Sequence, residues 1–299
     1  MREVGVKAEQ TILVTGVSGQ VGFELLRSLQ GLGRVVACDR SMLDLSELDR
    51  VRDIVRQIRP SIIVNPAAYT AVDKAETDID AARRLNVDVP RILAEEAAKT
   101  GGVLIHYSTD YVFDGTKDGP YVETDAPNPQ NVYGLTKLEG EQAIAATDCA
   151  HLILRTSWVY GRRGKNFLLT MLKLGHERPE LRVVADQIGA PTWSRMIATG
   201  TSHIIAQGMT VGSSDWWTTR SGVYHFSAAG ETSWHGFAEA IFATALGEQA
   251  PKVIPIPSSE YPVPAKRPAN SRLALDKLTD TFGLQMSAWR DALRLCLSE

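Results

Sequence analysis

The sequence has few cysteines and no long apolar stretch. Only three residues of 299 are cysteine (Cys38, Cys149 and Cys296), and none belongs to a CxxC pair. A disulfide framework or a thiolate metal site is therefore not expected, and a reducing compartment such as the cytoplasm fits. No apolar run approaches the roughly 20 residues that span a bilayer. The charged start, MREVGVKAEQ, lacks the apolar segment of an export signal, so we do not expect export.

The sequence also lacks an excess of either charge. Its 32 basic and 35 acidic side chains give a formal net charge of −3. This balance provides no broad positive surface for a nucleic-acid backbone or an anionic membrane, so we expect neither as a partner. The length is enough for one large or two modest domains with a real core.

Short β-rich runs alternate with helical patterns through the first half of the chain. Strands are predicted at 11–15, 34–38, 61–65, 103–108 and 151–156, and helices at 21–29, 46–59, 79–99 and 131–146. Ser46 is the expected cap of the second helix. Strands separated by helices of this length predict an α/β fold with a doubly wound parallel sheet covered on both faces.

The pattern is looser after Tyr160 and predicts a smaller α/β lobe with more loops. Helices are expected at 168–174, 197–205 and 234–246, strands at 181–184 and 223–226, a polar loop at 208–222 and a Pro-rich run at 251–268. Trp216 and Trp217 lie in the polar loop, where local packing is favoured over a partner surface.

The first predicted strand leads into a glycine-rich turn, Gly16-Val-Ser-Gly19-Gln-Val-Gly22. Gly16 permits a tight turn, Gly19 lets the backbone approach a pyrophosphate, and Gly22 lets the next helix pack closely on the strand. The start of that helix would direct N–H groups at the phosphates. Because the turn joins the first strand to the first helix, it predicts a dinucleotide site rather than an ordinary turn.

Two residues of opposite charge follow the second predicted strand. Asp39 could accept a hydrogen bond from an adenosine ribose 2′-hydroxyl, which favours NAD. Arg40 could bind a 2′-phosphate, which favours NADP, or it could be an exposed loop charge. NADH and NADPH therefore both remain open.

Tyr133-Gly-Leu-Thr-Lys137 is the only YxxxK segment in the chain. Positions i and i+4 share one helix face, so both side chains can reach the same pocket. A nearby ammonium lowers the pKa of a phenol, which suits a general acid. Thr109, at the end of the fourth strand, could offer its hydroxyl to the carbonyl oxygen that Tyr133 protonates. An aromatic ring packed beside a surface lysine is the plainer interpretation, but the position within a dinucleotide fold favours catalysis.

Together these features resemble the extended short-chain dehydrogenase/reductases, and most closely the members that act on dTDP-linked keto sugars. The resemblance runs from about residue 12 to residue 273, in the segments VTGVSGQVG, NPAAYTAVDKAE, HYSTDYVFDG, NVYGLTKLEGE, RTSWVYGRRGKNF, DQIGAPT, YHFSAAGETSW and AKRPANSRL. It implies an NAD(P)H-dependent oxidoreductase that reduces the C4 keto group of dTDP-4-dehydro-L-rhamnose to dTDP-L-rhamnose. The product would supply cell-surface polysaccharide such as the O-antigen of lipopolysaccharide.

The resemblance also implies roles for individual residues. Tyr133 would protonate the C4 oxygen, Lys137 would hold the nicotinamide ribose and lower the pKa of Tyr133, and Thr109 would polarise the carbonyl. The predicted cofactor positions, most of them carried over from the family, are Gly16, Gly19, Gln20, Val21, Gly22, Asp39, Arg40, Asp44, Leu45, Ala67, Ala68, Tyr69, Thr70, Tyr107, Tyr133 and Lys137. The predicted substrate positions are Thr109, Asp110, Tyr111, Val72 and Trp158, together with Arg267 and Arg272, which could bind the diphosphate or form surface salt bridges.

We expect residues 1–160 to form a Rossmann-like dinucleotide-binding domain, rejoined by part of 194–227. Residues 161–299 would mainly form the lobe that binds a small-molecule sugar nucleotide, in a monomer or homodimer. The family is associated with Mg²⁺, but Glu24 is isolated in sequence and Arg195 is found where an acidic partner would have helped. Mg²⁺ is retained as a candidate ion without a predicted ligand. His106 is expected in the core rather than in catalysis.

Two other functions remain open. The first is another sugar-nucleotide 4-epimerase or 4,6-dehydratase, although the dehydratases usually have Asp-Glu after the threonine where this chain has Asp110-Tyr111. The second is a non-catalytic regulatory subunit with a dinucleotide site. Such a subunit would not need Thr109, Tyr133 and Lys137 together.

Overall fold

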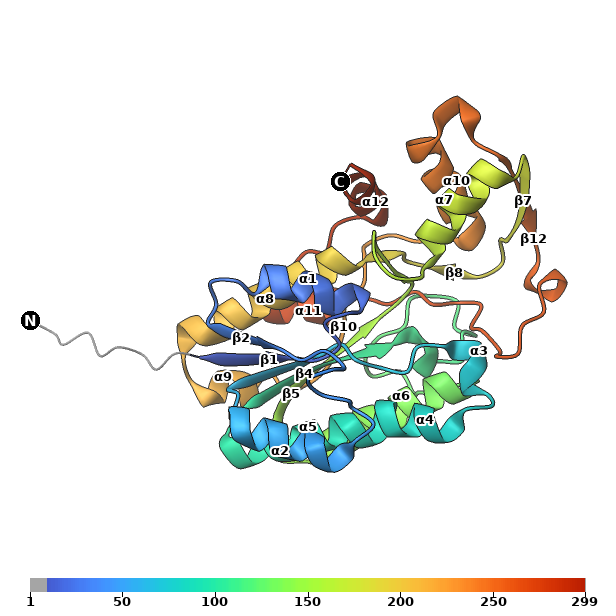
Figure 1. The fold of residues 1–299 in the computed structure, drawn as a ribbon. Helices are drawn as coiled ribbons and strands as arrows, with labels where there is room; N and C mark the ends of the chain where they lie inside the picture. The colour runs from blue at the N-terminus through green and yellow to red at the C-terminus, as the bar shows by residue number, and fades with distance from the viewer. Residues whose placement is uncertain (1–9, 299) are drawn as a thin grey trace, which may run out of the picture.

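The computed structural model describes residues 10–298, so the charged start that predicts no export signal lies almost wholly outside the described residues. Six strands form the central sheet, namely β1 (Thr11–Val14), β2 (Arg34–Ala37), β3 (Ile62–Asn65), β4 (Val103–Thr109), β5 (Ala150–Thr156) and β10 (Gly222–His225). Their spatial order is β10-β5-β4-β3-β1-β2, and every neighbouring pair is parallel (Figure 1). The predicted doubly wound parallel sheet is confirmed.

Helices cover both faces of this sheet (Figure 1). One face carries α2 (Leu48–Ile58), α4 (Ile79–Arg83), α5 (Val89–Thr100) and α6 (Val132–Ala145), and the other carries α1 (Gln20–Ser28), α8 (Ser194–Val211) and α11 (Asp276–Phe282). Successive strand residues point to opposite faces, so Ile12 and Val14 join one core and Leu13 joins the other. Burial on both faces explains why β1 and β3 are almost continuously apolar.

A single helix at 79–99 is not what the structure shows. α4 ends at Arg83, a π-helical turn follows at Arg84–Asp88, and α5 begins at Val89. The turn brings the buried Asn86 amide to Tyr69, where Oδ1 accepts from the backbone N–H at 2.8 Å and Nδ2 donates to the carbonyl at 3.2 Å. Hydrophobic periodicity cannot predict these contacts, because they join residues 17 positions apart in the sequence.

Two other local predictions were wrong. Ser46 does not cap α2, since Glu47 occupies the cap position and the Ser46 hydroxyl donates to Asp44 Oδ1 at 2.7 Å. The segment 208–222 is not simply a polar loop, because α8 continues to Val211 and α9 (Ser214–Thr218) follows. Trp216 and Trp217 are buried with rings 4.7 Å apart, which confirms local packing.

The second lobe contains three small sheets. They pair β7 (Glu180–Val184) with β12 (Lys252–Ile256), β8 (Ile188–Gly189) with β11 (Thr232–Ser233), and β6 (Val159–Tyr160) with β9 (Thr192–Trp193). Its main helices are α7 (Phe167–Glu177), α10 (Trp234–Ala245) and α12 (Trp289–Leu297), which share a core around Phe237. The remaining short helices among the described residues are α3 (Val72–Ala75), η2 (Asp110–Val112), η3 (Gly247–Gln249) and η4 (Ser258–Glu260). The lobe lies at the upper right of Figure 1, and the Pro-rich run contributes β12 to it.

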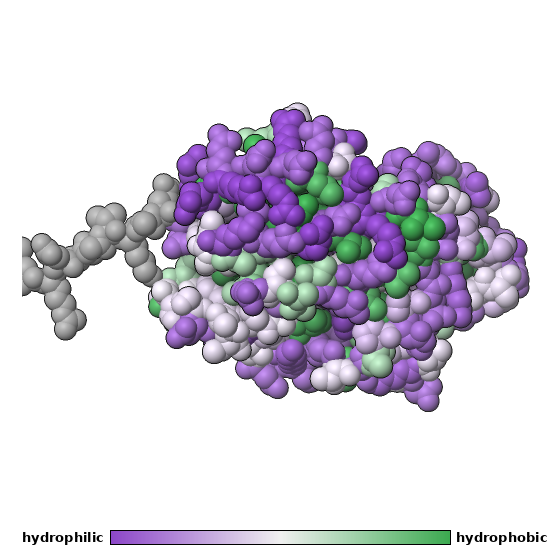
Figure 2. Space-filling view, turned by 90° about the horizontal axis from the view of Figure 1, so that it is seen from below, coloured by the Kyte–Doolittle hydropathy of each residue, from purple (hydrophilic) through white to green (hydrophobic). Residues whose placement is uncertain are grey.

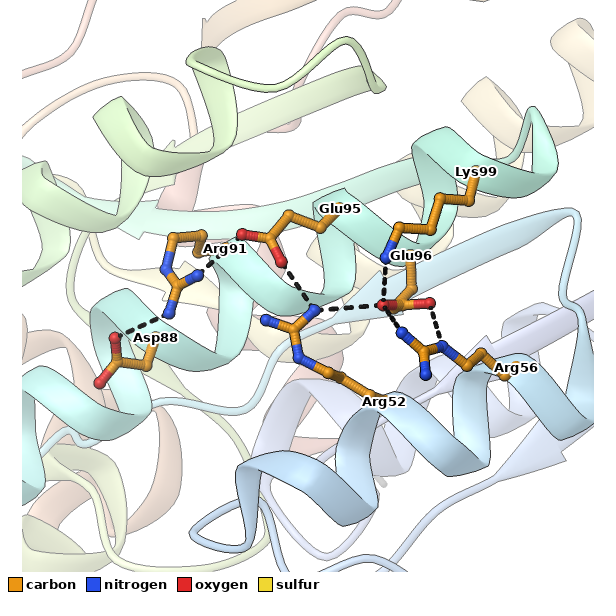
Figure 3. A network of polar contacts seen from close by, with 7 residues as sticks. All are labelled: Arg52, Arg56, Asp88, Arg91, Glu95, Glu96 and Lys99. Carbon is orange, nitrogen blue, oxygen red and sulfur yellow. Dashed lines mark hydrogen bonds and ion pairs between the residues drawn. The ribbon is translucent and has the colours of Figure 1, made fainter.

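A network of ion pairs joins α2 to α5 (Figure 3). Glu96 on α5 is only 2% exposed and accepts hydrogen bonds from Arg52 (3.1 Å), Arg56 (2.8 and 3.0 Å) and Lys99 (2.7 Å). The hydrogen bond from Arg56 is the largest cause that lowers the pKa of Glu96 to about 2. The network therefore anchors the second helix of the fold to the sheet-covering α5.

The outer surface matches the composition. The face seen in Figure 2 is mostly hydrophilic, and its hydrophobic residues form small separate groups. Among residues 10–298, no helix is both long enough and apolar enough to cross a bilayer.

Candidate active site

A cleft of about 850 Å³ lies at the carboxyl ends of the central strands and extends to the second lobe. This edge is where ligands bind in parallel α/β sheets. Most predicted site residues line it, namely Gly16, Gly19, Gln20, Val21, Gly22, Ala67, Ala68, Thr70, Val72, Tyr107, Thr109, Asp110, Tyr111, Tyr133, Lys137, Trp158 and Arg267. Residues from both halves of the chain therefore meet in one cavity.

The glycine-rich turn is built around close backbone contacts. Gly16 has φ +56°, and a Cβ on Gly22 would lie 2.3 Å from the Gly16 carbonyl oxygen, so neither position accepts another residue without strain. Gly19 N–H donates to the Gly16 carbonyl at 2.9 Å. No side chain of the described residues caps α1, which begins at Gln20. The uncapped helix start and the glycine surface fit the pyrophosphate of a dinucleotide.

The adenosine-side residues lie after β2, outside the lining of the cleft. Asp39 Oδ1 accepts from Ser41 Oγ (2.6 Å), Ser41 N–H (2.9 Å) and Met42 N–H (3.1 Å), and these bonds lower the pKa of Asp39. The Arg40 side chain is 85% exposed and pairs with Asp44 at 3.2 Å. Leu45 packs against the core below α2. Arg40 is thus exposed in a surface ion pair with Asp44, whereas Asp39 is held in its turn.

The residues after β3 form another wall of the cleft. Pro66, Ala67, Ala68 and Thr70 line it. Tyr69 does not, because its hydroxyl donates to Asp78 Oδ2 at 2.9 Å. The Tyr69 backbone is held by Asn86, as described above.

Helix α6 carries Tyr133 and Lys137 into the cleft. Asn131 caps it by accepting from Gly134 N–H at 2.8 Å. A Cβ on Gly134 would lie 2.1 Å from the Tyr111 carbonyl oxygen, so the helix depends on glycine to lie against the turn after β4. This close contact explains why the YxxxK segment has glycine at position 134.

Thr109 contacts both the carboxyl group of Asp110 and the phenol of Tyr133. Its hydroxyl donates to Asp110 Oδ1 at 3.0 Å and also hydrogen-bonds the Tyr133 side chain. Burial raises the pKa of Asp110 to about 6, against the opposing hydrogen bonds from Ser271 and Thr109. Thr109 is thus placed between a carboxyl group and a phenol.

The pKa of Tyr133 differs from the expected direction. Burial raises it to about 12, while the Thr109 hydrogen bond acts in the opposite sense and Lys137 is not among the causes. Lowering by Lys137 was therefore the wrong prediction for the protein without ligand. Burial also lowers the pKa of Lys137 to about 8, against Glu141, which raises it. The phenol is consequently protonated near neutral pH, as a proton donor must be.

The predicted sugar-side residues surround the open part of the cleft. The Tyr111 and Tyr133 rings meet edge to face at 5.5 Å. Trp158 has φ +47° and stacks on Trp234 with centroids 3.7 Å apart. Arg267 lines the cleft and pairs with Asp73 at 2.9 Å. These side chains present aromatic surface and one guanidinium to a ligand.

Arg272 is placed differently from the other candidates. It is not part of the cleft lining, and its guanidinium contacts Glu231 at 3.2 Å and Asn270 Oδ1 at 2.9 Å. These contacts indicate that Arg272 stabilises the loop before α11.

Several cleft residues were missed in the sequence. They are Ser18, Pro66, Ser108, Thr156, Val159, Gly164, Lys165, Asn166 and Trp234. Asn166 donates to Gln20 Oε1 at 2.8 Å and so joins the second lobe to the glycine-rich turn. Six of these residues belong to the segments RTSWVYGRRGKNF and YHFSAAGETSW. The family resemblance of these two segments was the signal from which the six residues could have been predicted.

The described residues give no support for a Mg²⁺ site. Glu24 Oε2 lies 2.9 Å from Arg195 Nε, so its carboxylate is engaged by a cation. Within residues 10–298, no group of three His, Cys, Asp or Glu side chains could hold a metal ion.

Known proteins resemble the chain over nearly its full length. The family model described as RmlD substrate binding domain matches residues 10–299. The chain is 51% identical to a dTDP-4-dehydrorhamnose reductase of Burkholderia thailandensis over 96% of this chain and 98% of that protein. It is 43% identical to the Escherichia coli K12 protein of the same name, over 96% and 97% of the two chains.

Solved structures agree with these relatives. A dTDP-4-dehydrorhamnose reductase from Bacillus anthracis in complex with NADP has a TM-score of 0.88 at 35% identity, covering 97% of this chain and 99% of that one. A Thermus thermophilus UDP-glucose 4-epimerase, at 18% identity and TM-score 0.78 over 97% and 98% of the chains, shares the fold. The chain belongs to the family of the RmlD substrate binding domain.

Proposed function

We propose that this protein is an NAD(P)H-dependent reductase of dTDP-4-dehydro-L-rhamnose, which forms dTDP-L-rhamnose. The observation that carries the proposal is the meeting of Thr109, Tyr133 and Lys137 with the glycine-rich turn in one cleft. Relatives at 51% and 43% identity bear the name of this reductase, and a structural relative binds NADP. The product would serve the synthesis of rhamnose-containing surface polysaccharide.

The cofactor would lie along the glycine-rich turn and the wall after β3. Reduced nicotinamide supplies a hydride when it is bound. Gly16, Gly19, Gln20, Val21 and Gly22 would hold its phosphates, and Ala67, Ala68, Thr70 and Tyr107 would line its path. On the adenosine side, Asp39, Arg40, Asp44 and Leu45 are the candidates, with Tyr69 acting through its backbone.

Tyr133 would donate its phenolic proton to the C4 oxygen as hydride arrives at C4. Its raised pKa keeps that proton in place near neutral pH. Thr109 would donate to the same oxygen, and the Lys137 ammonium would hold the nicotinamide ribose. Each role follows from a side chain that lines the cleft.

The sugar nucleotide would occupy the part of the cleft next to the second lobe. Val72, Asp110, Tyr111 and Trp158 would contact the sugar, and Arg267 would approach the diphosphate. We retain the division into a dinucleotide-binding part, residues 1–160 with part of 194–227, and a substrate lobe, mainly 161–299. The α8–α1 packing and the place of β10 in the central sheet support it. Action in the cytoplasm, as a monomer or homodimer, stays a prediction.

Two observations weigh against the other functions. The residue after Asp110 is Tyr111, whose ring packs against Tyr133, so the Asp-Glu pair of the dehydratases is missing at this position. A regulatory subunit without catalysis would have no use for Thr109, Tyr133 and Lys137 together in one cleft.

The deciding assay incubates the protein with dTDP-4-dehydro-L-rhamnose and follows the absorbance of NADPH and NADH in separate reactions. We expect stoichiometric cofactor oxidation and formation of dTDP-L-rhamnose. No oxidation with either cofactor would overturn the proposal. Tightly bound NAD with no net consumption would instead indicate an epimerase or dehydratase.

A further inference from the structure

A buried chain of hydrogen bonds ends at Lys137. Thr15 Oγ1 donates to Asn65 Oδ1 at 2.6 Å, Asn65 Nδ2 lies 3.0 Å from His106 Nδ1, and His106 Nε2 lies 3.0 Å from Lys137 Nζ. Thr15, Asn65 and His106 are completely buried, and Lys137 is 1% exposed. The first three residues follow or belong to β1, β3 and β4, so the chain crosses three neighbouring strands beneath the cleft.

We propose that His106 is a positioning residue for Lys137, whose imidazole accepts a hydrogen bond from the ammonium and keeps it charged and directed toward the cleft. This inference rests on the proposed function of Lys137. Only the burial of His106 was predicted from the sequence; its contact with Lys137 was not.

The contacts of Lys137 explain why one acceptor matters. An ammonium has three N–H donors. One donates to the Tyr107 carbonyl at 2.6 Å, and His106 Nε2 is placed to accept a second. The third is left for the cleft, which Lys137 lines. Loss of the imidazole would leave a buried N–H without an acceptor, which favours the neutral amine.

The imidazole is suited to accept because it is neutral. Burial is the largest cause that lowers the pKa of His106 well below its ordinary value, and the neighbouring Lys137 ammonium is the second. A ring that accepts at Nε2 carries its proton on Nδ1, and the Asn65 amide can turn its oxygen toward that proton. The Thr15 hydroxyl can donate or accept in either orientation of the amide.

Other charged and titratable groups also face Lys137. On α6 they are Glu141, which raises the pKa of Lys137, and Tyr133, one turn before it. From β5, Arg155 pairs with Glu141 at 2.6 Å and offsets its charge. Asp110, in the turn after β4, lines the same cleft as Lys137, whereas the phenol of Tyr107 bonds Thr201 of α8 on the opposite face of the sheet. A test must therefore change His106 alone.

The experiment follows the Lys137 ammonium directly by ¹⁵N NMR of lysine Nζ over a pH series, in the protein without substrate. The signal is assigned by its loss in Lys137→Arg. His106→Gln keeps a polar group near the position of Nε2, His106→Asn keeps one only near Nδ1, and His106→Leu keeps neither. His225→Gln, which changes another completely buried histidine, is the matched control.

We expect Lys137 to titrate near pH 8 in the wild type, in His106→Gln and in His225→Gln. It should titrate about one pH unit lower in His106→Leu and His106→Asn, where kcat/KM should fall about tenfold more at alkaline than at acidic pH. Equal Nζ titration in all variants, or a shift in His106→Gln as large as in His106→Asn, would overturn the inference. If His106→Leu does not fold, the Asn and Gln variants still decide.

The two proposals fail separately. A wild-type protein that does not oxidise NAD(P)H with the keto sugar contradicts the proposed function. The Nζ titration needs neither substrate nor cofactor and still tests the role of His106.

Discussion

The indole of Trp158 stacks on that of Trp234, with ring planes 11° apart. At position 189, Trp158 leaves room only for glycine, since a Cβ on Gly189 would lie 2.7 Å from the indole. The positive φ of Trp158 is a strained conformation that such surroundings must maintain. The stack therefore fixes a residue proposed to contact the sugar.

Trp234→Ala is expected to raise KM for the keto sugar about 2- to 10-fold, the size of a lost aromatic pair, with little change in NADPH affinity. Steady-state kinetics and NADPH fluorescence titration measure the two effects. Trp234→Phe, which keeps a ring, is the control. An equal loss of cofactor affinity would show that the stack does not act on the sugar side.

Tyr133→Phe is expected to lower kcat about 10²- to 10⁴-fold, because it removes the proposed proton donor. The variant should retain its fold, since only the hydroxyl is lost. Turnover is measured with NADPH and the keto sugar, and folding by thermal unfolding. Near-normal turnover would contradict the role of Tyr133.

Asp110→Asn is expected to stabilise the protein at pH 7 to 8 but not near pH 4. The pKa of Asp110 is raised to about 6 in the folded protein, so the folded state binds this proton more tightly than the unfolded chain does. The wild type therefore loses stability as pH rises from about 4 through 6, and the variant does not.

Thermal unfolding at both pH values tests this prediction. Asp114→Asn is the matched control with the opposite sign, because hydrogen bonds from Thr116, Asn128 and Tyr121 lower the pKa of Asp114. That variant should lose stability near neutral pH. Equal shifts of Asp110→Asn at both pH values would refute the expectation.

Glu96→Gln is expected to reduce the free energy of unfolding at pH 7 by about 1–3 kcal/mol, because it weakens hydrogen bonds to three cations. The lowered pKa of Glu96 means that its contribution is complete above about pH 4.5 and is lost as pH falls toward 2. Urea unfolding at pH 7 and pH 3 should show the difference shrinking. Glu47→Gln, an exposed glutamate before α2, should have little effect at either pH.

Arg40→Ala is expected to raise KM for NADPH about tenfold and to leave KM for NADH nearly unchanged. The reason is that Arg40 is exposed and could exchange its surface ion pair with Asp44 for a 2′-phosphate, while Asp39 is held by Ser41 and Met42. Kinetics with both cofactors measures the ratio. Parallel changes would show that Arg40 does not distinguish them.

The sheet and helix α6 could be predicted because their signals are local. Apolar, mostly β-branched runs define β1 and β3, and the turn from Gly16 to Gly22 lies directly between a strand and a helix. Tyr133 and Lys137 are one helical turn apart, so their spacing alone brings them to one face.

The remaining features depend on residues far apart in sequence. The π-helical turn places Asn86 against Tyr69, and the contact of His106 with Lys137 joins β4 to α6. In the two-residue strand β8, Ile188 hydrogen-bonds the backbone of Ala269 and Ser271, more than 80 positions away. Periodicity does not report such contacts. The direction of the Tyr133 pKa was missed because burial, which sequence spacing does not measure, sets it, and Lys137 is not among its causes.

The return of the chain to the central sheet through α8 and β10 affects the order of synthesis. A ribosome that has completed residues 1–160 has made the whole glycine-rich turn, Thr109 and the YxxxK segment. It has not yet made α8, which covers α1, or β10, which protects the edge of β5. Leu25 and Leu29 therefore stay uncovered until α8 ends at Val211, and the edge of β5 stays open until about residue 225, so we expect a gene cut after residue 160 to yield an aggregating fragment.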